Sequence, residues 1–329
     1  MSYVSVTLLP APAKLTQLRQ VVDLLGYQVS RDSMKIPNRV GNYFWYERSD
    51  YKSWTGVELD IYKSNGAIMV NTRSRSGRSY WDLVKQNETI KLIRDLFGGT
   101  FETDAGNGRY FRPYNDPPSH VSSGCYLARW RCHNALTKVD FYLQSRKLEG
   151  QIARDRPSGF PFIDEMNPRL LSNNLLVPYV LAVWEEYFRA TFAVIFQHSD
   201  ARQSVLKKAR LSHSQLESIA AQSYQIERVI ADCFSFQRPS AIGKNFKLID
   251  SQLDLAGAIR KPYRNRKRTL FDSIDKVVEM RNIIVHEGDF DHTLFDKELK
   301  TVVDDVRVAI DRIYDALGTR FDFEPIRDY

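Results

Sequence analysis

The segment VEMRNIIVHEGDFDH, residues 278–292, has an arginine where the preceding pattern predicts an apolar side chain. Upstream of it, apolar residues recur every three or four positions, as on the buried face of a helix. These residues are Leu270, Phe271, Ile274, Val277 and Val278. Arg281 takes the next position on this face, and His286 follows five residues later. Because burying an unpaired charge is very costly, Arg281 needs an anionic or carbonyl partner, such as Glu185 or Glu186, or must face another subunit.

Arg281, Asn282 and His286 are expected along one edge of this helix. On an ideal helix His286 lies about 140° around the axis from Arg281 and close under Asn282. Gly288 is expected to end the helix. A histidine in the last turn feels the negative end of the helix dipole, which favours its charged form. A permanently charged arginine beside a histidine that titrates near neutrality can stabilise a phosphorane and move a proton without a metal.

The first hundred or so residues alternate strand and helix signals. Residues 3–8 are strand-like, and the run VELDIYKSNGAIMVNT contains two alternating stretches joined by Asn-Gly, a strong hairpin signal. Helices are predicted over residues 14–25 and from Ser79, a plausible N-cap, to Phe97. These signals predict a small α+β domain with a mostly antiparallel sheet.

From residue 169 onward nearly all of the sequence has helical periodicity, which predicts a helical bundle. The expected long helices cover residues 169–197, 214–234, 270–286 and 294–317. The stretch RPSGFPFIDEMNP before them contains three prolines and a glycine and marks a boundary. The predicted organisation is an α+β domain over residues 1–118, a helical linker over 119–168 and an all-α bundle over 169–329.

Composition limits the class of protein. The 329 residues are 43% hydrophobic and 26% charged, which suits a soluble globular protein. The sequence contains no run of about 18 uncharged apolar residues, so no membrane-spanning helix is predicted. Three cysteines suit a reducing compartment. The net charge of +7 favours an anionic partner such as nucleic acid. We therefore expect a cytoplasmic protein with no membrane association.

A basic segment leads directly into the helix that carries Arg281. The stretch LAGAIRKPYRNRKRTL, between Asp254 and Asp272, holds no acid and six basic residues. They are Arg260, Lys261, Arg264, Arg266, Lys267 and Arg268. Such a density of positive charge gives a salt-sensitive grip on phosphates, so we predict that this segment contacts RNA near one end of the site. The alternative is a solvated loop whose basic residues pack on acids of the same chain.

The sequence predicts no metal site and no cofactor. His120, Cys125, Cys132 and His133 fit no zinc finger or ribbon spacing, and no C-x2-C pair is present. The glycines of DAGNGR lack the strand–GxGxxG–helix context of a dinucleotide site. A DNA-binding regulator is disfavoured because no helix-turn-helix signal is found.

The segment RNIIVHEGD resembles the R-x4-6-H motif of the HEPN superfamily (higher eukaryote and prokaryote nucleotide-binding domains). In that family the residue after the arginine is typically Asn, Asp or His, which agrees with Asn282. The run LVPYVLAVWEEYFRATFAVIF, with an acidic pair among apolar residues, also resembles the first HEPN helix. The resemblance covers roughly residues 169–320 and implies an all-α domain that forms homodimers.

The resemblance further implies a metal-independent endoribonuclease in which Arg and His from two protomers form one composite cleft. Arg281 would bind the scissile phosphate, and Asn282 would orient it or hydrogen-bond to it. His286 would act as general base or acid when the RNA 2′-hydroxyl attacks, leaving a 2′,3′-cyclic phosphate. Glu185 or Glu186 would orient a catalytic side chain. The apolar face would then be interrupted by an arginine because that face continues into a subunit interface.

Related nucleases are often bacterial toxins or antiphage defence effectors. The resemblance therefore makes RNA, a second copy of the chain, and a trigger or antitoxin the expected partners, with the N-terminal domain sensing or selecting something. Toxins silenced by nucleotidylation tend to carry Tyr directly after the motif histidine, whereas Glu287-Gly288 follows here. The alternative is a non-catalytic HEPN module that binds RNA or a partner protein, with Arg281 and His286 serving only a dimer contact.

Overall fold

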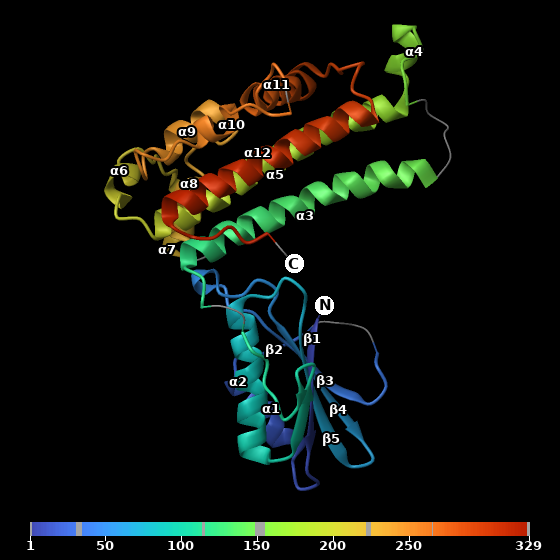
Figure 1. Cartoon of the computed structure of the whole chain (residues 1–329), viewed down its shortest axis with the longest axis vertical. Coiled ribbons are helices and arrows are strands. Elements are labelled where there is room, and N and C mark those ends of the chain that lie inside the picture. Colours follow the sequence, from blue (N-terminus) through green and yellow to red (C-terminus); the bar gives the residue numbers. More distant parts are fainter. Residues whose placement is uncertain are drawn as a thin grey trace. The chain divides into compact units, whose positions relative to one another are not determined.

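A computed structural model describes residues 2–30, 35–113, 116–148, 155–221, 225–264 and 266–327 of the chain. It divides the protein into two compact units, residues 1–123 with 326–329 and residues 124–325. One unit contains the strands and the other is helical (Figure 1). The two classes of structure predicted from the sequence are thus confirmed.

The N-terminal unit is built on one antiparallel seven-stranded sheet with the strand order β2-β3-β4-β5-β1-β6-β7. The strands are β1 (Tyr3–Leu9), β2 (Gln28–Val29), β3 (Arg39–Trp45), β4 (Val57–Ser64), β5 (Ala67–Ser74), β6 (Thr100–Thr103) and β7 (Gly106–Asn107). Helices α1 (Leu15–Leu24) and α2 (Tyr80–Phe97) cover the same face of the sheet (Figure 1). A 3₁₀ turn, η1, lies at Ser49–Tyr51.

Two local predictions for this unit are confirmed. Strands β4 and β5 pair from Val57–Ser74 to Ser64–Ala67, and both turn residues have the positive φ that a tight hairpin requires, 49° at Asn65 and 81° at Gly66. Helix α2 begins after Ser79, whose side chain accepts a hydrogen bond from the backbone N–H of Asp82 in a capping box.

Strand β3 was not predicted from the sequence. Its register against β4 shifts between Arg39 and Gly41, as at a β-bulge, and all seven of its residues are half-buried. The strand therefore lacks the alternation of buried and exposed residues on which a period-two prediction depends.

The helical unit contains three long helices, α3 (His120–Leu148), α5 (Pro168–Gln197) and α12 (Asp296–Phe321). Shorter elements connect them: α4 (Pro161–Glu165), α6 (Arg202–Leu206), α7 (His213–Ala220), α8 (Ile226–Ala231), α9 (Pro239–Phe246), α10 (Leu255–Arg260), α11 (Leu270–Asn282) and η2 (Ile283–Glu287). The single long helix predicted over residues 214–234 is wrong. Gln225 has an extended backbone and serves as the N-cap of α8, so the helix does not continue through it.

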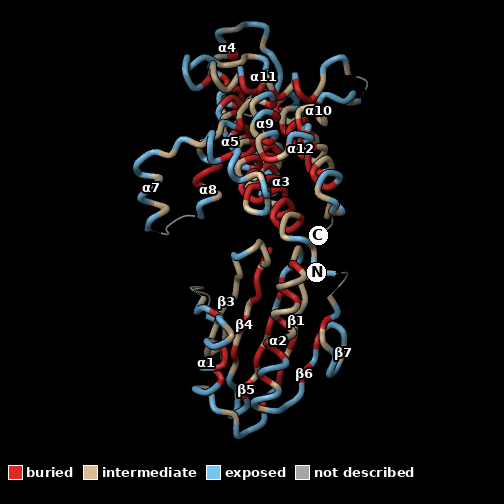
Figure 2. The backbone as a smooth tube through the Cα atoms, turned by 90° about the vertical axis from the view of Figure 1, so that its left-hand side faces the viewer, coloured by how far each residue is buried: buried red, intermediate tan, exposed pale blue. Residues whose placement is uncertain are grey.

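Apolar faces of the long helices form the core of this unit, as the buried positions in Figure 2 show. On α5, Trp184, Phe188 and Phe192 are fully buried, and Phe192 contacts Phe236 and Phe246 edge-on or tilted. The buried stripe of α12 consists of Leu299, Val303, Val306, Ile310, Ile313 and Leu317. Within the described residues, no helix combines the length and apolar character needed to cross a membrane.

Candidate active site

The helix that carries Arg281 changes type just after it. The α-helical hydrogen-bond pattern of α11 ends at Asn282, and residues 283–287 form a single π-helical turn that stops at Gly288, whose φ is 71°. The predicted end of the helix at Gly288 is thus confirmed. Glycine suits this position because it adopts a left-handed backbone without strain. The expected α-helical geometry up to His286 is wrong in this last turn. A turn closed by i→i+5 hydrogen bonds is wider than an α-helical turn, so His286 is rotated less far around the helix axis from Asn282. Such turns are frequent at functional sites.

Arg281 is half-buried and its guanidinium has no carboxylate within ion-pair distance among the described residues. Its Nη1 donates a hydrogen bond to the Oδ1 atom of the neighbouring Asn282 at 3.1 Å. The direct salt bridge to Glu185 or Glu186 that would have given Arg281 a structural role is therefore not found among the described residues. The arginine keeps hydrogen-bonding capacity for another anion.

Glu185 lies on α5, which packs against both α11 and η2, and its side chain is half-buried. Burial raises the pKa of the Glu185 carboxyl above its usual range. The positive charges of Arg189 and Arg281, together with a hydrogen bond from Gln237, lower that pKa in part. Glu185 is thus coupled electrostatically to Arg281 without forming an ion pair with it.

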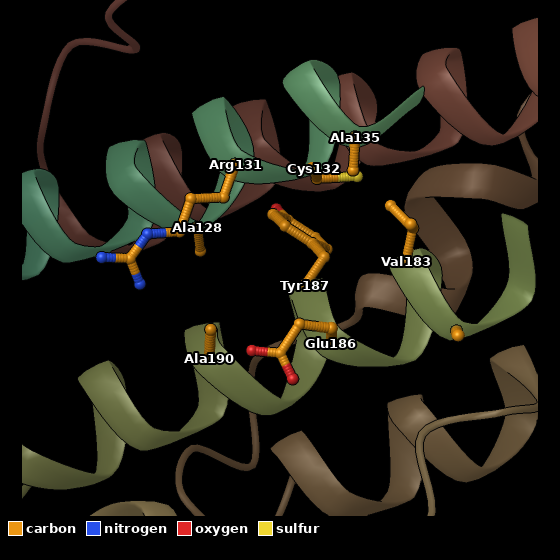
Figure 3. A pocket seen from close by; sticks show the side chains of 9 residues that line it. Ala128, Arg131, Cys132, Ala135, Val183, Glu186, Tyr187 and Ala190 are labelled. Atoms are coloured by element: carbon orange, nitrogen blue, oxygen red, sulfur yellow. The ribbon is translucent and has the colours of Figure 1, made fainter. Parts of the chain in front are cut away.

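Glu186 has a different set of neighbours. It is exposed and pairs with Arg189 at 3.3 Å and with Arg228. It also lines a cavity of about 220 Å³ between α3 and α5, where Tyr187 reaches toward Cys132 (Figure 3). Of the two glutamates expected at the site, the structure therefore brings Glu185 near Arg281 and pairs Glu186 with Arg189 and Arg228.

His286 is exposed on the π-helical turn, and no described residue forms a hydrogen bond or ion pair with its ring. Ile283 and Val285 beside it are also exposed, at 41% and 49%, while Ile284 between them is buried. This turn therefore presents two exposed apolar side chains beside an accessible imidazole.

Two residues that the sequence analysis missed hold the chain that follows His286. Asn174 of α5 donates from Nδ2 to the carbonyl oxygen of Asp291 at 3.1 Å and accepts from its N–H at 2.8 Å. Asn173 donates to the carbonyl oxygen of Leu294 at 2.9 Å. Both asparagines are fully buried. The sequence signal for this role was the pair of adjacent asparagines within an apolar helical run, because buried amides need specific hydrogen-bond partners.

The basic segment lies at the opposite end of α11 from Arg281. Arg281 lies eleven positions after Leu270, which is about 17 Å along the helix axis at 1.5 Å per residue. Arg260 stacks over the Phe271 ring, 3.7 Å from its centroid, and Arg266 pairs with Asp305 at 2.9 Å. The chain between α10 and α11 therefore does not line the immediate surroundings of His286. Among the described residues, no group of His, Cys, Asp and Glu side chains is arranged to hold a metal ion.

Replacing Glu185 with glutamine should raise the free energy of unfolding at pH 7 and leave it unchanged at low pH. The folded-state pKa of Glu185 is raised, so the folded protein binds more protons than the unfolded chain between the ordinary and the raised pKa. The stability of the wild type consequently falls as pH rises through that interval, whereas Glu185→Gln lacks this loss. Thermal unfolding of both proteins across a pH series measures the difference.

Glu186→Gln is the matched control for this experiment. It removes exposed ion pairs with Arg189 and Arg228, so it should lower stability slightly at pH 7, by less than about 1 kcal/mol. A Glu185→Gln protein that is less stable than the wild type at pH 7 would contradict the assignment of Glu185 as a carboxylate penalised by burial.

A family model described as RiboL-PSP-HEPN matches residues 158–319 of the chain. The matched range contains both glutamates of α5 and the whole of α11 and η2, and it ends within α12. The sheet-containing unit lies outside it. Among curated proteins and solved structures, none matches the chain.

Proposed function

The C-terminal half of the chain belongs to the HEPN superfamily, as a RiboL-PSP-HEPN domain, and from this we propose that the protein is a metal-independent endoribonuclease. Domains of this superfamily are generally related to ribonucleases. The observation that carries the proposal is Arg281, half-buried and without a carboxylate partner in the described chain, on the same helix end as the exposed His286. The first can bind a phosphate and the second can move a proton.

The chemistry follows from these groups. A neutral His286 takes the proton of the RNA 2′-hydroxyl as its oxygen attacks the adjacent phosphorus. Arg281 stabilises the negative charge that develops on the phosphorane oxygens, while Asn282 hydrogen-bonds the phosphate. The bond from phosphorus to the 5′-oxygen then breaks, and a protonated histidine donates a proton to that oxygen. The products are a 2′,3′-cyclic phosphate and a 5′-hydroxyl.

This reaction needs one histidine as base and another as acid, and one chain supplies a single His286 at the site. We therefore infer that two copies form a composite cleft, with each copy contributing Arg281 and His286. The exposed Ile283 and Val285 support such a contact, because a two-fold interface brings the same apolar patch of both copies together. We assign Glu185 to orient Arg281, because the two side chains lie close enough to interact electrostatically.

We further propose that the nuclease serves as a toxin or antiphage defence effector in the cytoplasm. In this proposal the N-terminal α+β unit receives the trigger or selects the RNA, and an antitoxin or inhibitor restrains the cleft. The support is the chain's organisation, in which a unit outside the family match is joined to the nuclease domain.

Incubating the purified full chain with transfer RNA and total RNA in EDTA tests the proposal. We expect cleavage that survives chelation and leaves 2′,3′-cyclic phosphate ends. A substrate with a 2′-deoxy residue at a mapped cut should resist cleavage there, because the attacking hydroxyl is missing. RNA binding without cleavage would favour the second candidate, a non-catalytic HEPN module. Cleavage that stops when metals are chelated would contradict the mechanism.

A further inference from the structure

We propose that the chain between α10 and α11 is a separate phosphate-binding site for single-stranded RNA, about 17 Å from the cleavage motif along α11. We name it the basic loop, residues 261–264 and 266–268. The proposal rests on the proposed function, since it assigns a second contact to the same RNA substrate. Its consequence is that RNA long enough to reach both sites binds more tightly than RNA that reaches only Arg281.

The basic loop is organised around one aromatic ring. Three guanidinium groups lie close to the Tyr263 ring, with centroid distances of 5.0 Å for Arg264, 5.2 Å for Arg266 and 5.3 Å for Arg312 of α12. The Tyr263 hydroxyl is buried and forms no hydrogen bond with any described residue. The face of an aromatic ring attracts cations, so the Tyr263 ring gathers these guanidinium groups. Its unpaired hydroxyl can still donate a hydrogen bond to a ligand.

Two of these arginines hold the loop in place. Both oxygens of the buried Asp305 carboxylate accept hydrogen bonds from Arg266 Nη1 at 2.9 Å. Arg312 donates to the carbonyl oxygens of Lys261 and Pro262, each at 2.8 Å. The backbone at Lys261 and Pro262 is therefore held to α12, and these two arginines are already engaged.

Four other cations remain available to a ligand. They are exposed, and none forms a salt bridge with a described residue: Lys261, Arg264, Lys267 and Arg268. The next acid along the chain, Asp272, accepts a hydrogen bond from Thr269 at 2.7 Å within the capping box of α11. Arg268 is partly compensated by Asp272, whose pKa it helps to lower, whereas Lys261, Arg264 and Lys267 have no carboxylate partner among the described residues. Such a cluster of positive charge suits the closely spaced phosphates of an RNA strand.

Arg264 adds an independent observation. Its φ of 49° lies in the left-handed region, where an arginine is strained and glycine is not. The chain nonetheless has arginine at this position, with its side chain against Tyr263. We infer that arginine is present at this position for its positive charge, since glycine would fit the left-handed backbone better.

The test compares RNA binding by two charge-matched variants in a His286→Ala background, which slows cleavage during the measurement. The first neutralises the loop with Lys261→Ser, Arg264→Gly, Lys267→Ser and Arg268→Ser. The control removes four exposed lysines elsewhere in the same unit, by Lys207→Ser, Lys208→Ser, Lys244→Ser and Lys297→Ser. Dissociation constants for RNAs of about 4 and about 16 nucleotides are measured by fluorescence anisotropy over a salt series.

We expect the loop variant to bind the longer RNA at least tenfold more weakly. Its salt slope should fall by about 0.7 for each phosphate that the loop no longer neutralises, or about 2 to 3 in total. Binding of the shorter RNA and the behaviour of the control should change little. Equal weakening in the control, or an unchanged slope in the loop variant, would overturn the proposal, as would tighter binding of a polyglutamate peptide than of RNA.

Arg264→Gly alone separates function from folding. Because glycine relieves the left-handed strain, the thermal midpoint should stay the same or rise while RNA binding weakens. A protein that loses stability and keeps its affinity for RNA would assign Arg264 a structural role instead. Cleavage by the wild type is scored separately, so a failure of the proposed nuclease and a failure of the loop site give different results.

Discussion

Replacing Arg281 or His286 with alanine should lower the rate of RNA cleavage in EDTA by about 10²- to 10⁴-fold. Arg281→Ala removes the cation that stabilises charge on the phosphorane, and His286→Ala removes the group that takes or gives the proton. The rate is measured on one mapped cut in transfer RNA under single-turnover conditions, so that product release does not hide the chemical step.

Both substitutions should leave the fold intact, which makes the rates interpretable. His286 is exposed, and the described hydrogen bond of Arg281 is the one to the adjacent Asn282. Glu287→Ala and His292→Ala, on either side of Gly288, serve as controls and should retain cleavage. A His286→Ala protein that cuts as fast as the wild type would exclude the proposed acid–base role, and the superfamily membership would then stand without this activity.

Asp296→Ala should lower the free energy of unfolding of the helical unit by roughly 3–5 kcal/mol. Asp296 begins α12 and is only 7% exposed. Its carboxylate accepts hydrogen bonds at 3.0 Å from Arg146 of α3, Arg169 of α5 and Asn173 of α5. Removing the carboxylate takes away the anion that the half-buried Arg146 and the buried Arg169 share, and leaves Arg169 only its longer contact with Asp155 at 3.6 Å. This costs more than the loss of three hydrogen bonds between neutral groups. Denaturant unfolding followed by helical circular dichroism measures the change.

Asp304→Ala on the same helix is the matched control. Asp304 also pairs with two cations, Lys300 at 2.6 Å and Arg307 at 3.0 Å, but these side chains are partly exposed. Its loss should cost no more than about 1 kcal/mol, because water screens and replaces such pairs. Equal effects at Asp296 and Asp304 would show that burial does not distinguish the two networks.

Local signals in the sequence were sufficient for much of the N-terminal unit. The β4–β5 hairpin depends on Asn65 and Gly66, which tolerate positive φ, and α2 starts where Ser79 can cap it. Both are decided by a few neighbouring residues. Strand β3 depends instead on a bulge and on pairing with β4, so its own residues carry no clear period.

The sequence by itself determined the candidate chemistry of this protein. Arg281, Asn282 and His286 lie within six residues of one helix end, so their mutual placement follows from local geometry up to the π-helical turn. It also determined the density of positive charge before α11. These features depend on residues close together in the chain.

Only the tertiary structure decided which distant groups act on them. Glu185 and Glu186 are adjacent in sequence, yet the packing of α5 brings one to Arg281 and pairs the other with Arg228. Within the basic loop, contact with α12 engages Arg266 and leaves Arg264 free of any carboxylate in the described chain. A charged side chain can be read from the sequence, but whether it is compensated depends on which helices pack together, because electrostatic partners are set by distance in space.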